Sequence, residues 1–410
     1  MPTIHSREFS LLMALLMSIV SFSIDATLPA LGHIGQAFAV AEANHVQWVI
    51  TSIFAGMTIG QLIAGPLSDA IGRKRILFSG VAIYLAGSVL CYLATGFEVF
   101  LLGRFIQGLG VSGPYIAAIS VVRDKFSGPD MAKVMSVIMM VFMVAPAVAP
   151  SIGQAIITLA GWHAIFLVYI VYALVASLWI ALRLDETLAP ENRTPMKLKA
   201  FEHGFLEVVS NRTTMSYLLC TGLCFGGLIA YLGSSQQIFM HQFGLSGATF
   251  SLCFAGLAAV MSIASFVNSR IVAHFGMRKV TMTAMTVITL ISLLFLLVQI
   301  SGVQASLWMF MAYAMVLFFA FGVMFGNLNA IAMEPMGHVA GMASAIIGAV
   351  SSILSLVLAT FIGQLYNNTL IPLTTGFFVL FALSVLVTYG EMKWHALQAL
   401  AGGDMEAERG

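Results

Sequence analysis

Two ionisable residues, Asp25 and Arg104, stand inside long apolar runs of the sequence. Because a charge at the centre of a bilayer costs at least about 2.5 kcal/mol, such residues are expected to face a cavity or a buried partner. A buried carboxyl group can bind and release a proton or hold a cation, and a neighbouring guanidinium modulates that exchange. We therefore interpret Asp25 as a candidate proton-coupling and substrate-binding residue, and Arg104 as its partner in proton coupling.

The depth of these two residues in the membrane is expected to match. Each lies six residues from the outer end of its predicted helix, about 9 Å deep at 1.5 Å per residue, so both can reach one cavity. Two alternatives stay open. The first is a structural ion pair between the two helices, and the second is an Arg104 side chain that extends to Glu98 or to backbone carbonyls.

The composition of the chain predicts a membrane protein. Of the 410 residues, 60% are hydrophobic and 9% are charged, whereas a soluble domain would carry roughly 25% charge. Apolar runs of about 20 residues, the length of a membrane-spanning helix, follow one another along the whole chain. We expect an all-α membrane protein with twelve transmembrane helices, at residues 9–31, 46–67, 76–95, 98–121, 131–157, 163–183, 213–237, 247–272, 279–301, 306–330, 337–362 and 371–391.

Basic residues indicate the orientation of these helices. Of the 18 Lys and Arg residues, all except Arg104 fall on one side of the predicted membrane. By the positive-inside rule that side is the cytoplasm, so both termini are expected there. We expect an integral multi-pass membrane protein. The net charge of +1 gives no indication of a nucleic-acid partner.

A polar interruption between Arg183 and Arg212 divides the predicted helices into two groups of six. The loops after the second and eighth helices share a glycine followed by basic residues, at Gly72 and at Gly276, which indicates an internal duplication. Duplicated halves around a central site are typical of transporters. We expect an N-terminal six-helix bundle at residues 1–185, a cytoplasmic linker at 186–210, a C-terminal six-helix bundle at 211–395 and a cytoplasmic tail at 396–410.

The fifth predicted helix contains Pro146 and Pro150 four residues apart, followed by Gly153. Each proline removes a backbone donor and bends the helix. A bent helix with a face of small residues can pack closely against a partner and seal one side of a cavity. A kink that is merely tolerated is the alternative.

The sequence gives no indication of catalysis or of a bound metal. All four cysteines fall in apolar runs, where we expect buried thiols. Neither a catalytic motif nor a glycine-rich phosphate loop accompanies the intramembrane charges. We therefore expect no enzyme activity and no cofactor, with protons as the coupling ion.

Four segments of the chain resemble motifs of the major facilitator superfamily, specifically of its twelve-helix drug:proton antiporters of the bicyclomycin/chloramphenicol-resistance (Bcr/CflA) type. The segment from Gly65 to Arg75 resembles motif A and is the most specific signal. The segment around Arg104 resembles motif B, and residues 145–153 resemble motif C. Residues 25–31 resemble the first-helix pattern of these antiporters.

This resemblance implies a major facilitator fold and alternating access driven by protons. Motif B links Arg104 to proton coupling, and motif C associates Pro146, Pro150 and Gly153 with antiport. Two glycines often seen in motif C are replaced here by Ala149 and Gln154, so import remains an alternative to export. A conformational role on the cytoplasmic side is implied for the residues of motif A and the inner end of the fourth helix, namely Gly65, Asp69, Gly72, Arg73, Arg75 and Arg123.

The cavity expected between the halves is lined by apolar, aromatic and amide side chains. A single acid in such a cavity favours small lipophilic molecules that are neutral or carry one positive charge. Packing against other helices or lipid is the alternative role for these residues, and hydrogen bonding between helices is the alternative for Asn327. The candidate substrate contacts, besides Asp25, are Met57, Tyr115, Tyr231, Gln236 and Asn327.

Together these features predict proton-coupled efflux of small lipophilic molecules by a monomeric transporter, whose partners are its substrate, protons and membrane lipids. A proton-coupled importer or symporter, or an exporter of an endogenous metabolite such as a siderophore, is the first alternative. A non-transporting membrane receptor is the second. The receptor is disfavoured because the longest predicted loop, of about thirty residues, is too short for a soluble domain.

Overall fold

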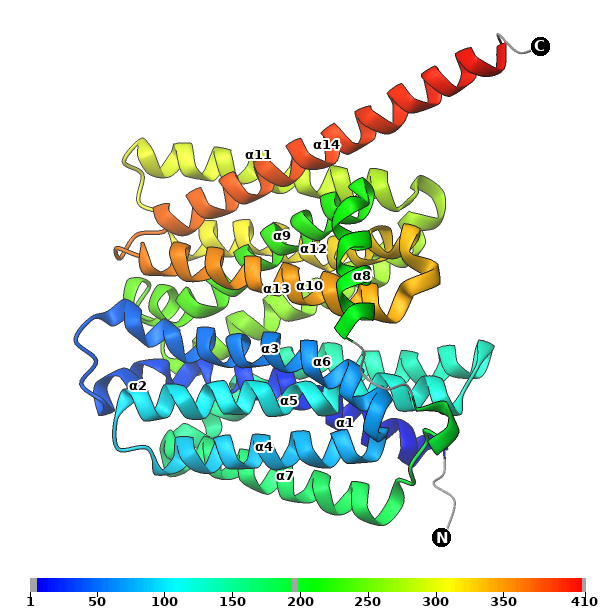
Figure 1. Cartoon of the computed structure of the whole chain (residues 1–410). Coiled ribbons are helices and arrows are strands. Elements are labelled where there is room, and N and C mark those ends of the chain that lie inside the picture. The colour runs from blue at the N-terminus through cyan, green and yellow to red at the C-terminus, as the bar shows by residue number, and fades with distance from the viewer. Residues whose placement is uncertain (1–5, 194–197, 408–410) are drawn as a thin grey trace.

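The computed structural model describes residues 6–193 and 198–407, which are almost entirely helical (Figure 1). In this part of the chain, twelve helical segments are long and apolar enough to cross a membrane. The all-α fold class predicted from the sequence is therefore confirmed. Residues 194–197 of the expected linker and 408–410 of the expected tail lie outside the described residues, as do residues 1–5.

The first six membrane-spanning segments form the N-terminal half. The first of them is interrupted, because α1 (Ser6–Asp25) is followed by a 3₁₀ turn, η1 (Leu28–Ala30), and a short helix, α2 (Leu31–Ala37). A second 3₁₀ turn, η2 (Ala43–Gln47), leads into the next helix. The remaining helices of this half are α3 (Trp48–Ile71), α4 (Arg73–Leu93), α5 (Phe97–Lys125), α6 (Gly128–Ala160) and α7 (His163–Arg183).

The last six membrane-spanning segments form the C-terminal half. Its first helix ends in a π-helical turn, η4 (Gln237–Gln242), and a 3₁₀ segment, η5 (Glu334–Val339), separates its fourth and fifth helices. Its helices are α9 (Arg212–Gln236), α10 (Gly247–Phe275), α11 (Met277–Ile300), α12 (Leu307–Met333), α13 (Ala340–Gln364) and α14 (Ile371–Ala407).

Two helical segments were not predicted from the sequence. The linker contains the helix α8 (Leu198–Ser210), preceded by a 3₁₀ turn, η3 (Pro190–Asn192). The last helix, α14, continues to Ala407, well beyond the predicted end of the twelfth span at residue 391. Both differences arise because hydropathy locates the apolar part of a helix, whereas a helix can continue through polar sequence outside the membrane.

The two halves lie side by side as separate bundles, α1–α7 in one and α9–α14 in the other (Figure 1). The first described residue, Ser6, and the last, Ala407, lie at the same end of the molecule, and α8 crosses the other helices near that end. We name this the terminal end and the opposite one the distal end.

Close helix packing in the N-terminal half depends on glycine. A Cβ atom at Gly56 of α3 would collide with the carbonyl oxygen of Phe105 in α5, and one at Gly108 of α5 would collide with the carbonyl oxygen of Ile53. Small residues permit this backbone contact, which stabilises helix pairs where lipid removes the hydrophobic driving force. The α3–α5 contact holds the segment that carries Arg104 at a fixed distance from its neighbours.

Candidate functional site

The central feature of the N-terminal half is the interruption of the first span directly after Asp25. Pro29 lies in η1 and has no N–H with which to continue the helical ladder. The amide of Thr27 turns to the carbonyl oxygen of Ile24, at 3.2 Å, instead of the carbonyl of Ser23. The break therefore leaves the Ser23 carbonyl available to other donors inside the bundle.

Asp25 lies at the end of α1 and is buried, with 5% of the residue exposed. Its carboxylate accepts a hydrogen bond of 2.5 Å from the hydroxyl of Ser21, one turn earlier on the same helix. No ion pair joins Asp25 to a described residue. The sequence-predicted carboxyl group is thus enclosed in the protein, without a cationic partner among the residues that the structure describes.

Arg104 is fully buried on α5 and donates to the carbonyl that the helix break leaves available. Its Nη2 donates to the carbonyl oxygen of Ser23 at 3.0 Å, and its Nε donates to that of Val49 in α3 at 3.4 Å. Its Nη1 donates to Oε1 of Gln107 at 2.8 Å, one turn further along α5. One guanidinium therefore joins α1, α3 and α5.

These contacts decide between the alternatives that the sequence left open for the pair. Within the described part of the chain, Asp25 and Arg104 form no ion pair, and Arg104 binds backbone carbonyls instead. Arg104 binds the backbone two residues before Asp25, so both residues lie at the same interruption of the first span. Arg104 is fully buried within the N-terminal half, and a cavity shared by both residues stays a prediction.

Two buried tyrosines complete the polar network around the break. The hydroxyl of Tyr169 on α7 lies 2.9 Å from the hydroxyl of Thr27 and 3.2 Å from the carbonyl oxygen of Ser23. The hydroxyl of Tyr84 on α4 lies 2.6 Å from the hydroxyl of Ser23. Residues on both sides of the break are therefore fixed by neighbouring helices. Sequence reasoning missed both tyrosines, although each is a polar group within an apolar run and could have been selected on that ground.

The motif C residues lie in α6, which packs directly on the break. A Cβ atom at Gly153 would collide with the carbonyl oxygen of Ala26, the residue after Asp25. The carbonyl oxygen of Pro150 accepts a hydrogen bond of 3.1 Å from Ser251, which belongs to α10 in the other half. Pro146 and Pro150 both lie within a helix that continues to Ala160. Thus α6 connects the surroundings of Asp25 with the C-terminal half.

The motif A residues form a charged cluster at the terminal end. Arg73 binds Asp69, Ser68 and Asp124, the last at 3.0 Å. The carboxylate of Glu186, which follows α7, accepts from the amide of Arg73 at 2.9 Å. Three further motif positions lie around this cluster. Gly72 has a φ of 109°, which favours glycine. No described atom lies within 4 Å of a Cβ atom built at Gly65, and the side chains of Arg75 and of Arg123, on α5, are exposed.

A second charged cluster occupies the corresponding place in the C-terminal half. Nη1 of Arg278 lies 2.7 Å from a carboxylate oxygen of Glu391, and its Nη2 lies 3.2 Å from one of Glu334. The Glu391 side chain is fully buried, and it also accepts a hydrogen bond from Thr213 at 3.0 Å. Sequence reasoning missed Glu391, because residue 391 was assigned to the very end of the last span.

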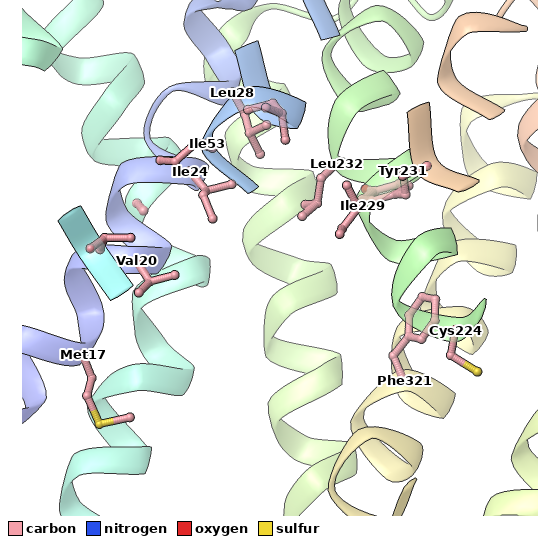
Figure 2. Packing of buried hydrophobic residues seen from close by; sticks show 14 of the residues in the cluster. Met17, Val20, Ile24, Leu28, Ile53, Cys224, Ile229, Tyr231, Leu232 and Phe321 are labelled. Carbon is pink, nitrogen blue, oxygen red and sulfur yellow. The ribbon is translucent and has the colours of Figure 1, made fainter. Parts of the chain in front are cut away.

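Apolar side chains from both halves line the surfaces that face each other. Figure 2 shows Val20 and Ile24 of α1 and Ile229 and Leu232 of α9 pointing from the two halves toward one another. Each of these four side chains is mostly buried. The facing surfaces of α1 and α9 are therefore apolar at these positions.

Two of the six candidate substrate contacts pack within the C-terminal half. Tyr231 points away from α1 (Figure 2) and packs edge-on against Phe318, with ring centroids 5.0 Å apart, so it belongs to the C-terminal core. Asn327 forms two amide hydrogen bonds of 3.0 Å with Asn268, which is the interhelical role left open for it. The proposed substrate contacts of these two residues are not supported by this arrangement.

The other candidates lie on several elements. Met57 is partly buried on α3, and its carbonyl oxygen accepts a hydrogen bond of 3.0 Å from Ser112. Tyr115 is partly buried on α5 and packs against Phe142 of α6. Gln236 is buried at the distal end of α9. Of the six candidates, Asp25 lies nearest to the junction of α1, α6 and η1.

Amide side chains join the two halves at the distal end. Nε2 of Gln47 donates to Oε1 of Gln237 at 2.5 Å, and Nε2 of Gln237 donates to Oδ1 of Asn44 at 3.1 Å. Asn44 also donates to the backbone carbonyls of Gln364, at 3.1 Å, and Tyr366, at 2.7 Å. We name Asn44, Gln47, Gln237 and Gln364 the distal clasp. Sequence reasoning missed it, since polar residues at predicted helix ends give no special signal.

The described residues offer little to a metal ion. They contain no group of three or more His, Cys, Asp and Glu side chains that could hold one. The four cysteines, Cys91, Cys220, Cys224 and Cys253, are free thiols, and the first three are buried. The chemistry of the site therefore rests on the carboxyl, guanidinium and hydroxyl groups described above.

Comparison with known proteins decides the family. Residues 13–360 match the family model described as Major Facilitator Superfamily. The chain belongs to this superfamily. It is therefore an integral multi-pass membrane protein that transports a small-molecule substrate, and not an enzyme.

Several relatives of this superfamily member are similar over nearly the whole chain. An uncharacterised MFS-type transporter, YdgK of Bacillus subtilis, is 30% identical over 403 residues, which cover 96% of this chain and 97% of the relative. A bicyclomycin resistance protein homolog of Haemophilus influenzae is 29% identical over 382 residues, covering 93% and 95%. A multidrug resistance protein, MdtL of Klebsiella pneumoniae, is 28% identical over 359 residues, covering 85% and 87%.

Solved structures show the same architecture. A D-xylose-proton symporter superposes with a TM-score of 0.71 at 14% identity, covering 93% of this chain and 97% of that one. The human organic anion transporter MFSD10 superposes with a TM-score of 0.65 at 16% identity, covering 94% and 100%. At these identities the likeness establishes the fold of two six-helix halves and nothing about the substrate.

Proposed function

We propose that this protein is a proton-coupled exporter of small lipophilic organic molecules, neutral or singly cationic, that works by alternating access. The observation that carries the proposal is the buried carboxyl group of Asp25, held without a described cationic partner at the interrupted end of α1. Such a group can hold a proton while it is enclosed and exchange it when the site opens. The names of the relatives, for bicyclomycin resistance and multidrug resistance, support export of drug-like molecules.

The terminal end is proposed to face the cytoplasm of a bacterial cell, in the inner membrane, because the Lys and Arg residues gather on that side of the sequence-predicted membrane. The distal clasp then closes the outer side, and the structure represents a state closed to the outside. Opening the distal end requires that the amide hydrogen bonds between the halves break. The transporter is proposed to work as a monomer with protons as its coupling ion.

A series of contacts is proposed to connect the proton site with the movement of the halves. Arg104 and Tyr169 fix the break after Asp25, and Gly153 packs on it from α6. Through Pro150, α6 in turn contacts Ser251 of the C-terminal half. A proton can shift the balance of the two states only if it binds one of them more tightly. Protonation of Asp25 would shift this balance by altering how α1 and α6 pack.

The motif A cluster is proposed to stabilise the opposite state. The side chain of Asp69 is about half exposed at the terminal end, although it already pairs with Arg73. When the terminal end closes, Asp69 and Arg73 can join nearby helix ends on that side, as the resemblance to motif A implies. The cluster would then contribute to the outward-facing form that protonation of Asp25 disfavours.

Import by proton symport is the second candidate, since motif C departs from the antiporter pattern at Ala149 and Gln154. Reconstitution in liposomes with an imposed pH gradient and an internal pH-sensitive dye distinguishes export by antiport from import by symport. Cationic and neutral drugs are added, and substrate-induced proton movement is recorded. Proton movement opposite to substrate flux supports antiport, and movement in the same direction establishes symport. Export of an endogenous metabolite is tested in the same assay with siderophores as substrates.

A further inference from the structure

The distal end contains a pocket to which the transport cycle proposed above assigns no ligand, although Asn44 and Gln237 of the distal clasp line it. Its volume is about 270 Å³, close to the lower end of the range for small-molecule sites. Glu42, Ala43 and Asn44 form the wall contributed by the N-terminal half. The other wall comes from the C-terminal half. It consists of Gln237, Tyr366 and Asn368. The pocket therefore lies across the junction of the two halves.

The lining of this pocket combines one carboxylate with side-chain amides. Glu42 supplies a carboxylate whose side chain is 73% exposed, and its described ion-pair partner is His45, at 3.4 Å. Asn44, Gln237 and Asn368 carry side-chain amides, and neither Lys nor Arg is among the described lining residues. The amide oxygens of Asn44 and Gln237 each accept one hydrogen bond within the distal clasp and keep a second lone pair. Asn368 has a φ of 62°, in the left-handed region that costs most residues free energy. This loop conformation brings Asn368 to the pocket.

We propose that the pocket binds a small organic cation bearing an N–H group, such as a primary ammonium ion, and that the bound cation holds the distal end closed. An ammonium group has three donors and no acceptor, which matches one carboxylate and several amide oxygens. Hydrogen bonds between charged groups are shorter and stronger than neutral ones. A quaternary ammonium ion carries the same charge but lacks the donors, so it should bind far more weakly.

The position of the pocket determines the effect of a ligand. Its two walls belong to different halves, so they separate when the distal end opens. A ligand that contacts both walls binds the distal-closed state and has little affinity for the open one. Such a ligand shifts the population toward the closed state in proportion to this difference in affinity. The site is thus a regulatory site that is reached from the distal side and is separate from Asp25.

The test is thermal unfolding of the purified full-length protein in detergent with millimolar n-butylammonium at constant ionic strength. Binding to the folded state raises the midpoint temperature, and the concentration dependence gives an apparent dissociation constant. Tetramethylammonium and 1-butanol are the control probes, one without donors and one without charge. The variant Glu42→Gln should weaken binding roughly fivefold, as expected for an exposed ion pair, while Glu42→Asp retains it. The matched control is Glu98→Gln, an exposed acid at the distal start of α5.

Stabilisation by n-butylammonium alone, weakened in Glu42→Gln and unchanged in Glu98→Gln, supports the proposal. An equal effect of tetramethylammonium, an unchanged effect in Glu42→Gln, or no stabilisation by n-butylammonium overturns it. A second measurement uses spin labels at positions 159 and 308, whose side chains are 86% and 80% exposed at the distal ends of the two halves. Added n-butylammonium should narrow their distance distribution toward the closed state, and a broadened distribution contradicts the proposed action. Neither experiment depends on the identity of the transported substrate.

Discussion

Arg104 donates a hydrogen bond of 3.0 Å to the carbonyl oxygen of Ser23, so a side chain of α5 binds the backbone where α1 is interrupted. A cation at the carbonyl end of a helix also interacts favourably with the helix dipole. Asp25 lies two residues further along, at the same interruption. Arg104 therefore affects the proton site by holding the helix that carries it, and not by a direct ion pair.

The first prediction concerns Arg104→Lys. Lysine keeps the charge, but its ammonium group cannot reproduce the planar set of donors that reaches α1, α3 and Gln107. We expect proton-coupled transport to fall by about tenfold or more, and the free energy of unfolding to fall by about 1.5–3 kcal/mol for each charged hydrogen bond lost. Transport in liposomes and thermal unfolding in detergent measure the two effects.

The control for this variant is Arg75→Lys, which changes an exposed arginine at the terminal end. We expect it to leave the unfolding midpoint unchanged. Wild-type transport and stability in Arg104→Lys would show that charge alone suffices at position 104, contrary to the geometry described here.

The second prediction concerns the contact between α6 and the break. In Gly153→Ala, the added methyl group would meet the carbonyl oxygen of Ala26, so one of the two helices must move. Because neither backbone can yield cheaply, we expect a loss of stability of about 1–3 kcal/mol, together with slower transport. Gly256→Ala on α10 is the matched control, since no described atom lies within 4 Å of a Cβ atom built at that position. Equal behaviour of the two variants would argue against a tight α1–α6 contact.

The third prediction concerns the distal clasp. Asn44→Ala removes hydrogen bonds to Gln237 and to the carbonyls of Gln364 and Tyr366. We expect the distal-open state to become more populated, with a longer distance between spin labels at positions 159 and 308. Asn367→Ala is the control, because the Asn367 side chain bonds Thr369 within its own loop. An unchanged distance distribution in Asn44→Ala would show that the distal clasp does not hold the distal end closed.

The sequence predicts the twelve spans and the two halves because burial in lipid requires long apolar helices, and this requirement is visible in composition. It also identifies Asp25 and Arg104, since isolated charges in apolar runs are conspicuous. It does not predict their relationship. That relationship depends on the helix break, which redirects the Ser23 carbonyl, and on the packing of α5 against α3.

The features that sequence reasoning missed share a physical reason. The roles of the clasp amides and of the buried Glu391 depend on partners that lie on other helices. Gln47 binds Gln237, and Glu391 binds Arg278. For Tyr231, the sequence suggested a substrate contact that the packing of the side chain does not support. Its position within an apolar span is compatible with either face of the helix, and only the packing of α9 shows that it points into the C-terminal half.

The most direct test of the account is transport by Asp25→Asn in liposomes, with pH-driven transport compared to substrate exchange at equal pH. Asparagine has a similar shape and can keep a hydrogen bond with Ser21, but it cannot bind and release the coupling proton. The account predicts that pH-driven transport is lost while exchange without a gradient persists. Full pH-driven transport in Asp25→Asn would contradict the assignment of Asp25 as the proton carrier.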